Sequence, residues 1–285
     1  MKFKLIPILL LLTGCSSGSN NIPLNTVKIT NLAGNAGGSG SIISHKKSES
    51  SILTNAHVCG VVKNGGLVHT TSGQSAMVVS YKTSSVHDLC VLTVAKDLGF
   101  SADVSSSAPK PYDEAIVSGH PRLLPNIITK GHFSGKMLIT LVTDVQPCDG
   151  KEENPQDQFF CQVFGVKPTI KTYETIVVSA TIQPGSSGSA VYNKDGEISA
   201  VIFAGAGDFG YGVAVPLEYV QTFLDTELRL TPKQTPELKI SGNMSSSRHS
   251  EIKDLIKKCE TLSHPDKDKY CGVFKDTVSF SNLME

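Results

Sequence analysis

Short apolar runs, broken by polar and turn-forming residues, fill the chain from Val27 to about Ala214. The runs are rich in β-branched residues and are separated by Gly, Pro, Asn and Ser, as is typical of strands joined by turns. Clear examples are residues 41–43, 51–54, 76–79, 90–94, 114–117 and 175–178. No long helical period lies between them, so the pattern predicts an all-β barrel or sandwich and disfavours a parallel α/β sheet.

Helical periodicity first appears after Pro216, which is suited to open a helix. Apolar residues then follow the helical period, at Leu217, Val220, Phe223, Leu224 and Leu228. A second helix is predicted over residues 250–262, where Ile252, Leu255, Ile256 and Cys259 share one face. Residues 231–248 between them are polar and irregular, which predicts a linker to a small tail.

The first fifteen residues have the pattern of an export signal. Lys2 and Lys4 precede the apolar run 5–12, which is too short to span a bilayer as a helix. Leu12-Thr13-Gly14-Cys15 also resembles the bacterial lipobox, which implies a diacylated Cys15 at the mature N-terminus. An ordinary signal peptide is the alternative. We expect a signal peptide at 1–14 and a lipidated flexible tether at 15–27.

Charge and cysteine content narrow the function classes. The 285 residues contain 26 basic and 26 acidic side chains, so the chain lacks the basic footprint typical of nucleic-acid binders. Removing Cys15 from the seven cysteines leaves six, which in an exported protein predicts three disulfides. Fifteen pairings are possible. Proximity in sequence favours Cys148 with Cys161 and Cys259 with Cys271, which leaves Cys59 and Cys90. No C-x-x-C or H-E-x-x-H spacing suggests a metal site.

Three motifs carry residues that can act together in acyl transfer. His57 follows the apolar strand Ser51-Ile52-Leu53-Thr54, Asp88 precedes the apolar run 89–92, and Ser187 lies in the Gly-flanked turn Gly185-Ser186-Ser187-Gly188. A serine hydroxyl needs a base to become nucleophilic, an imidazole can take its proton, and a carboxylate can orient the imidazole. Glycines beside the serine let backbone N–H groups turn toward a developing oxyanion.

These segments resemble the trypsin-like serine proteases, and most closely the bacterial HtrA/Deg-type protease domain. The residues that carry the resemblance are Thr54-Asn55-Ala56-His57, Asp88-Leu89-Cys90-Val91-Leu92 and Gly185-Ser186-Ser187-Gly188-Ser189-Ala190. Lesser segments at 38–43, 115–121 and 128–135 also fit. The resemblance covers about residues 28–229, so we assign 28–230 to a protease domain and 231–285 to a linker and a small helical, disulfide-tied tail.

The resemblance implies two orthogonal six-stranded β-barrels, a C-terminal helix, and an active site in the cleft between the barrels. It implies that Ser187 is the nucleophile, His57 the general base and acid, and Asp88 the orienting carboxylate. The N–H groups of Gly185 and Ser187 would form the oxyanion hole. His87, which neighbours Asp88, occupies a variable position of the family pattern and is interpreted as a loop residue. A Cys59–Cys90 bridge would tie together the segments of the base and its orienting acid; two buried thiols are the alternative.

Departures from the family pattern also have consequences. Ser186 stands where digestive members carry the Asp that pairs with a newly released N-terminus, so activation by that route is not expected. The 56 residues after Arg229 are too few for a PDZ domain. The implied S1 pocket is lined by Thr181, Ile182, Ile202, Phe203, Ala204, Gly212 and Val213. None of these is charged, which predicts a small or medium apolar P1 residue.

Together these patterns predict a lipid-anchored serine endopeptidase of the bacterial cell envelope that acts on proteins or peptides. In the lipobox pattern, Ser16 after the lipidated Cys implies outer-membrane sorting, on either face of that membrane. No cofactor, metal or nucleic acid is expected. The alternatives are a catalytically silent binding or adhesion lipoprotein with the same fold, and an esterase that uses the same triad. Residues 263–269 are interpreted as a solvated cap on the barrel, with a docking loop as the alternative.

Overall fold

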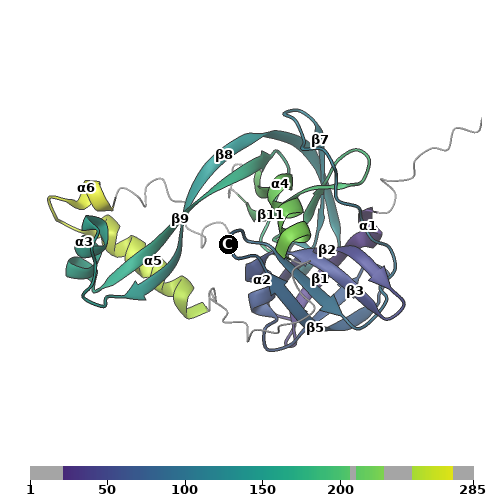
Figure 1. Ribbon diagram of the computed structural model, residues 1–285, viewed down its shortest axis with the longest axis horizontal. Coiled ribbons are helices and arrows are strands. Elements are labelled where there is room, and N and C mark those ends of the chain that lie inside the picture. The colour runs from purple at the N-terminus through teal and green to yellow at the C-terminus, as the bar shows by residue number, and fades with distance from the viewer. Residues whose placement is uncertain (1–21, 206–209, 228–245, 272–285) are drawn as a thin grey trace, which may run out of the picture.

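Two closed six-stranded antiparallel barrels make up most of this computed structural model (Figure 1), which describes residues 22–205, 210–227 and 246–271. In the first barrel the strands follow one another as β1-β2-β3-β6-β5-β4. Their bounds are β1 Thr26–Asn31, β2 Gly37–Lys46, β3 Glu49–Thr54, β4 Gly66–Thr70, β5 Ser75–Thr83 and β6 Cys90–Val94.

The second barrel has the order β10-β11-β12-β9-β8-β7 and closes where β7 pairs with β10. Its strands are β7 Glu114–Gly119, β8 Ile127–Pro147, β9 Val166–Val178, β10 Ala190–Tyr192, β11 Ile198–Gly205 and β12 Gly212–Pro216. The predicted all-β class and the two six-stranded barrels are confirmed.

Apolar residues follow each other without strict alternation because several strands are buried on both faces. On β3, Ile52 points into the core of the first barrel, whereas Leu53 joins a second core between the two barrels. Tyr192 and Phe203 of the second barrel belong to that same inter-barrel core. A strand covered on both sides has apolar side chains at successive positions, which explains its continuous hydrophobic run.

The packed domain begins earlier than the sequence suggested. Helix α1 (Ile22–Asn25) precedes β1, and Ile22 is 1% exposed within the inter-barrel core. Thr26 and Val27 are also buried in β1. The predicted tether at 15–27 is therefore too long at its C-terminal end, because Ile22 gains more by burial than by remaining in a solvated tether. Cys15 and the signal segment lie outside the described residues.

The helix predicted after Pro216 is present as α4 (Leu217–Thr222), and a π-helical turn at Phe223–Glu227 continues it. Besides α1, two further helices before it were not anticipated: α2 (Ala56–Val61) and α3 (Pro155–Phe164). Residues 121–123 form the short 3-10 turn η2, in which Arg122 and Leu123 have φ of 53° and 58°. Two successive non-glycine residues in this region mark a strained turn.

Strands β8 and β9 extend far beyond the barrel as a long hairpin (Figure 1). Their pairing runs from Phe133 opposite Val178 to Pro147 opposite Val166, and α3 connects them at the far end. Helices α5 (Ser246–Thr261) and α6 (Lys267–Tyr270) complete this part of the fold, which we call the distal lobe. The lobe has its own core, formed by Phe159, Phe160, Leu255, Cys259 and Cys271.

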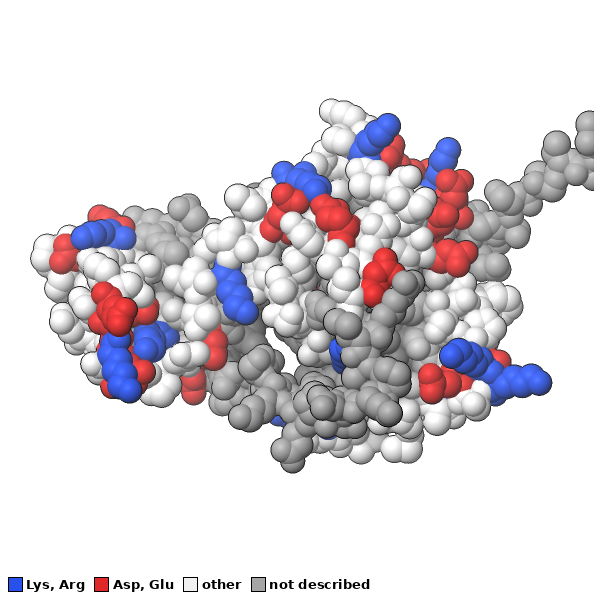
Figure 2. Space-filling view, in the orientation of Figure 1, with Lys and Arg blue, Asp and Glu red and all other residues white. Residues whose placement is uncertain are grey.

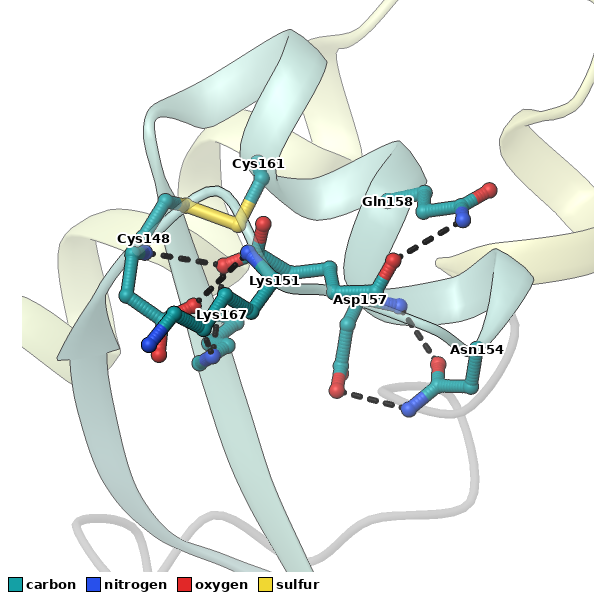
Figure 3. A network of polar contacts seen from close by, with 9 residues as sticks. Cys148, Lys151, Asn154, Asp157, Gln158, Cys161 and Lys167 are labelled. Atoms are coloured by element: carbon teal, nitrogen blue, oxygen red, sulfur yellow. Dashed lines mark hydrogen bonds and ion pairs between the residues drawn. A yellow bond between two sulfur atoms is a disulfide. The ribbon is translucent and has the colours of Figure 1, made fainter.

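Helix α3 begins between Cys148 and Cys161 and includes Cys161. The Asn154 side chain accepts a 2.7 Å hydrogen bond from the Asp157 N–H, Pro155 opens the helix, and Gly165 ends it at φ 73°. These are strong start and stop signals. The Cys148–Cys161 disulfide ties the hairpin to the helix beside Lys167, which binds Asp149 and Glu152 (Figure 3).

The tail segment caps the distal lobe rather than the barrel. A Cys259–Cys271 disulfide joins α5 to the end of α6. The rings of His264 and Tyr270 lie 5.3 and 4.7 Å from the Phe159 ring of α3. The prediction that residues 263–269 cap the barrel was therefore wrong. The tail packs instead on the aromatic side chains of α3, which offer it an apolar surface.

Acidic and basic side chains are interspersed on the face drawn in Figure 2, with no large area of one sign. This distribution agrees with equal numbers of acidic and basic residues. Within the described part of the chain, every helix is too short or too polar to cross a membrane.

Candidate active site

His57 and Asp88 meet at the edge of the first barrel. His57 lies in the first turn of α2, directly after β3, and Asp88 lies just before β6. The His57 ring Nδ1 lies 2.6 Å from Asp88 Oδ2, and the His57 backbone N–H donates a 3.0 Å bond to Asp88 Oδ1. The side chains are 10% and 18% exposed. A carboxylate held at two points and shielded from water fixes the orientation of the imidazole.

Asn55 positions Asp88 through a hydrogen bond to its backbone. Its side-chain Nδ2 donates a 2.7 Å hydrogen bond to the Asp88 carbonyl oxygen, and Asn55 is fully buried. Asn55 is the N-cap of α2, yet its side chain makes no capping bond. The residue exchanges its usual capping role for a contact with a segment 33 positions away. In the sequence, Asn55 is recognisable only as part of the motif that precedes His57, and this contact has no local signal.

Ser187 is the second residue of the second of two successive tight turns, which share Ser186. The Ser186 N–H donates to the Gln183 carbonyl and the Ser189 N–H donates to the Ser186 carbonyl, each at 2.9 Å. Gly185 and Gly188 have φ of 89° and 85° and occupy the third position of each turn. That conformation is open to glycine and strained for other residues. The N–H groups predicted to form the oxyanion hole, those of Gly185 and Ser187, belong to this pair of turns.

Close contacts give a second reason why positions 185 and 188 are occupied by glycine. A Cβ atom at Gly188 would lie 2.1 Å from the Ser39 carbonyl oxygen, and one at Gly185 would lie 2.7 Å from the Arg122 backbone nitrogen. Side chains at these positions would push the serine turn away from β2 and from the η2 turn. Glycine therefore allows both barrels to approach the Ser187 segment.

The start of β2 brings the serine turn to the histidine segment. A Cβ atom at Gly38 would lie 2.7 Å from the Val58 Cγ2 and 2.8 Å from the Ser187 carbonyl oxygen. Val58 directly follows His57, so both segments pack on the same glycine. The Ser187 hydroxyl lies 3.4 Å from the Phe203 carbonyl oxygen of β11.

Ser39 joins three segments at this junction. Its hydroxyl donates to the Gly185 carbonyl and accepts from the His120 N–H, each at 2.8 Å. Its carbonyl oxygen accepts a 2.7 Å bond from the Thr54 hydroxyl. Ser39 is fully buried, and all its polar groups have partners on other elements. Sequence reasoning missed this role, because nothing in a Gly-Ser-Gly-Ser segment distinguishes one serine from the next.

The cysteines beside the two catalytic candidates form the expected bridge. Cys59 and Cys90 are both fully buried and are joined by a disulfide. It links α2, which carries His57, to β6, which follows Asp88. The alternative of two buried thiols does not describe this structure. All three predicted disulfides are present.

His87 packs on an aromatic ring of the second barrel's helix. Its ring stacks on Tyr219 of α4 at a centroid distance of 4.0 Å, as a loop residue would. A hollow of about 520 Å³ adjoins it and is lined in part by Tyr173 and Tyr219. Burial, and then the Asp88 carboxylate, raises the pKa of Tyr173 to about 12. This ring therefore stays a neutral phenol beside Asp88.

The seven residues predicted to line S1 do not all lie together. Ile182 contacts the positions of Gly205 and Gly212: a Cβ atom at Gly212 would lie 2.5 Å from Ile182 Cγ1 and 3.1 Å from Ile202 Cδ1. Phe203, Ala204 and Val213 belong to the inter-barrel core, and Thr181 is exposed. The structure thus places the Ile182 side chain against the paired glycines Gly205 of β11 and Gly212 of β12.

Metal-type ligands gather at one place in the described residues, at Cys148, Glu152 and Cys161. The two sulfur atoms are bonded to each other, so they cannot also ligate a metal ion.

Comparisons with known proteins agree with this fold. Residues 38–201 match the model of the trypsin-like peptidase domain. A search of curated protein sequences found no match. Solved structures share the fold at low identity. Rv3671c from M. tuberculosis H37Rv, as a serine-to-alanine mutant in its inactive form, is 21% identical, with a TM-score of 0.55 over 77% of this chain and 94% of that chain.

The active form of the Rv3671c protease is 17% identical, with a TM-score of 0.55 over 79% of this chain and 92% of its own. A serine endoprotease from Yersinia pestis is 21% identical, with a TM-score of 0.53 over 74% of this chain and 65% of its own. These likenesses establish the fold. Because the family model spans more than half of the 285 residues, the chain belongs to the trypsin-like peptidase domain family, and its enzyme class is that of the serine endopeptidases.

Proposed function

We propose that Ser187, His57 and Asp88 form the catalytic triad of a serine endopeptidase of the bacterial cell envelope, with a protease domain of the HtrA/Deg type. The two-point contact between His57 and Asp88 is the observation that carries this proposal. A carboxylate that bonds both the ring and the backbone of one histidine sets the tautomer in which Nε2 can accept a proton.

In the proposed reaction, Nε2 of His57 takes the proton of the Ser187 hydroxyl as the serine oxygen attacks the substrate carbonyl carbon. Asp88 stabilises the resulting imidazolium. The N–H groups of Gly185 and Ser187 donate to the oxyanion of the tetrahedral intermediate. His57 then returns the proton to the leaving amine, and water releases the acyl group from Ser187 by the same steps.

A fluorophosphonate probe tests the triad without knowledge of the substrate. We expect labelling of the lipid-free protein (from Ser16) at Ser187, found by peptide mapping, and its loss in Ser187→Ala and His57→Ala. His87→Ala is the matched control: this histidine neighbours Asp88 but stacks on Tyr219, so labelling should persist. A folded protein that is not labelled would favour the silent binding module. Labelling together with cleavage of esters but not of peptides would identify the esterase.

We propose that the substrate is a protein or peptide with a small or medium apolar P1 residue. The support is the Ile182 side chain, which lies against the positions of Gly205 and Gly212 and makes this surface apolar. Arg or Lys at P1 would find no counter-ion among Ile182, Ile202 and Gly212. A peptide library should give faster cleavage after Val or Ala than after Arg. Equal or faster cleavage after Arg would contradict the proposal.

We further propose that a lipid on Cys15 anchors the enzyme to the envelope, with the outer membrane as its destination. The support is the Leu12-Thr13-Gly14-Cys15 sequence. Metabolic labelling with a radioactive fatty acid should mark the wild-type chain and not Cys15→Ser. Release of the unlabelled wild-type chain into the soluble fraction would instead indicate an ordinary signal peptide.

A further inference from the structure

A second cavity lies on the other side of the loop that supports Gly185. It has a volume of about 300 Å³ and is lined by Lys28, His69, Thr70, Thr71, His120, Pro125 and Asn126. Lys28 comes from β1, His69 and Thr70 come from β4, and the last three residues come from the loop between β7 and β8. Both barrels therefore contribute to its wall. None of the proposed catalytic residues lines it.

His120 is the most unusual member of this wall. It is 4% exposed, its Nδ1 contacts the Leu124 carbonyl oxygen at 3.0 Å, and its buried Nε2 has no hydrogen-bond partner among the residues that the structure describes. A carbonyl oxygen only accepts, so Nδ1 carries the proton and donates it. A buried ring nitrogen without a partner costs free energy, which a ligand in the cavity can recover.

The charges around the cavity select the class of ligand. Lys28 and His69 act on His120 electrostatically, and Lys28 acts on His69, so the three basic groups face one another. Burial is the largest cause that lowers the pKa of both histidines, and these basic neighbours lower it further. The lining contains no carboxylate. A cation would meet the Lys28 ammonium group, whereas an anion would reduce the mutual repulsion of the bases.

The remaining lining groups suit an oxyanion. The Ser118 hydroxyl donates to Oδ1 of Asn126, so the amide NH2 of Asn126 is its donor end. Two threonines add hydroxyl groups. We propose that this cavity is an anion-binding site that takes a phosphate, sulfate or carboxylate group between Lys28, His69 and His120.

The site is contiguous with the serine turn. The Arg122 N–H donates to the Pro184 carbonyl at 2.5 Å, and a Cβ atom at Gly185 would lie 2.8 Å from the His120 carbonyl oxygen. Lys28 Nζ reaches the Leu123 carbonyl at 3.4 Å. A ligand held by Lys28 and His120 would thus rest on the strained η2 turn that supports Gly185. Binding itself can be measured without reference to peptidase activity.

Sulfate is the suitable probe because its charge does not change between pH 5 and 8. Calorimetric titration of the purified full chain with sodium sulfate, against chloride at equal ionic strength, should show one saturable site. Affinity should be roughly tenfold higher at pH 5.5 than at pH 7.5, because protonated His120 gains a donor at Nε2 and protonated His69, whose ring nitrogens contact Thr30 and Ser75, adds positive charge. Absence of saturable binding at pH 5.5 would overturn the proposal.

Variants locate the site. His120→Gln and Lys28→Met should each weaken sulfate binding about tenfold, since each removes a charge-assisted hydrogen bond. Lys28→Arg keeps the charge and should bind within about twofold of the wild type, which separates loss of the ligand contact from misfolding. Lys63→Met, at an exposed lysine of the same barrel, is the matched control and should change nothing. Equal affinity in all variants would place the ion elsewhere and overturn the proposal.

The source of the oxyanion is distinguished by two further probes at pH 5.5, inorganic phosphate and a phosphoserine peptide. Displacement of sulfate by phosphate alone would indicate a free ion, and displacement by the peptide would indicate a group carried on a polypeptide. Failure of both to displace sulfate would contradict a phosphate site.

Discussion

The backbone N–H of Ser39 donates a 2.8 Å hydrogen bond to the carbonyl oxygen of Ser187, 148 positions further along the chain. The bond crosses from the first barrel to the second. The Ser39 hydroxyl adds a bond to Gly185, two residues before Ser187. One residue of β2 therefore holds both ends of the turn in which the proposed nucleophile and oxyanion donors lie.

Ser39→Ala should lower both kcat/KM and the free energy of unfolding. The backbone bond to Ser187 remains, but the bonds of the hydroxyl to Gly185 and His120 are lost, at a cost of about 1–3 kcal/mol. We expect the oxyanion turn to loosen and kcat/KM to fall about tenfold or more. Ser44→Ala on the exposed part of β2 is the control. Unchanged kinetics in Ser39→Ala would show that the turn around Ser187 keeps its conformation without the Ser39 hydroxyl.

Asn55→Ala should disturb the position of Asp88 relative to His57, although neither of these side chains is altered. It removes the 2.7 Å bond to the Asp88 carbonyl and leaves that carbonyl without this donor. We expect a loss of about 1–3 kcal/mol in the free energy of unfolding and slower fluorophosphonate labelling. Lower stability with a normal labelling rate would mean that Asn55 supports the fold and not the position of Asp88.

Removal of the Cys59–Cys90 bridge should reduce both stability and activity. The bridge spans 31 residues, so the chain-entropy model assigns it about 3–4 kcal/mol. The double variant Cys59→Ser/Cys90→Ser, or treatment with a reducing agent, should lower the unfolding temperature and the rate of labelling at Ser187. The matched variant Cys259→Ser/Cys271→Ser alters the distal lobe and should leave labelling unchanged. Unaltered activity with both thiols free in the untreated protein would refute the bridge.

Ile182→Ala should widen the P1 preference. The Ile182 side chain is 8% exposed and lies against Gly205 and Gly212. Its truncation should raise kcat/KM for a Phe P1 relative to Val by about tenfold, at a stability cost of about 2–5 kcal/mol. Ile182→Val tests the same trend with a smaller cost. An unchanged Phe-to-Val ratio in a folded Ile182→Ala enzyme would place the P1 side chain elsewhere.

Stability should fall with acidification below about pH 6.5 in a manner that depends on His120. The pKa of His120 is lowered mainly by burial and then by Lys28 and His69, which outweigh the bond to Leu124. The unfolded state, with a pKa near 6.5, therefore binds protons first as the pH falls, and the free energy of unfolding decreases. The contribution is complete above pH 6.5. Urea unfolding at pH 7.5, 6.5 and 5.5 should show a shallower dependence for His120→Gln, and equal slopes would contradict this assignment.

Much of this protein could be predicted from local patterns. β-Branched runs with Gly and Pro turns indicated the barrels, and the motifs predicted His57, Asp88 and Ser187 as candidates, of which the structure brings His57 and Asp88 into contact. The helix at Pro155–Phe164 was missed although Asn154-Pro155 and Gly165 are start and stop signals, because apolar periodicity was weighed ahead of capping. The length of the β8–β9 hairpin was missed as well, since strand pairing beyond the barrel depends on contacts with α3 and α5.

The sequence by itself determined which residue types are available: a histidine, an aspartate, a serine between glycines, and six cysteines outside the signal segment. Only the tertiary structure decided what Ser39, Asn55 and His120 do, because each acts through a partner between 33 and 148 positions away. A hydrogen bond between distant segments has no local signature, since its geometry arises when two barrels close and pack against each other. Short-range preferences are read along the chain, whereas the positioning of Ser187 and the basic cavity beside it arise from the packing of the two barrels.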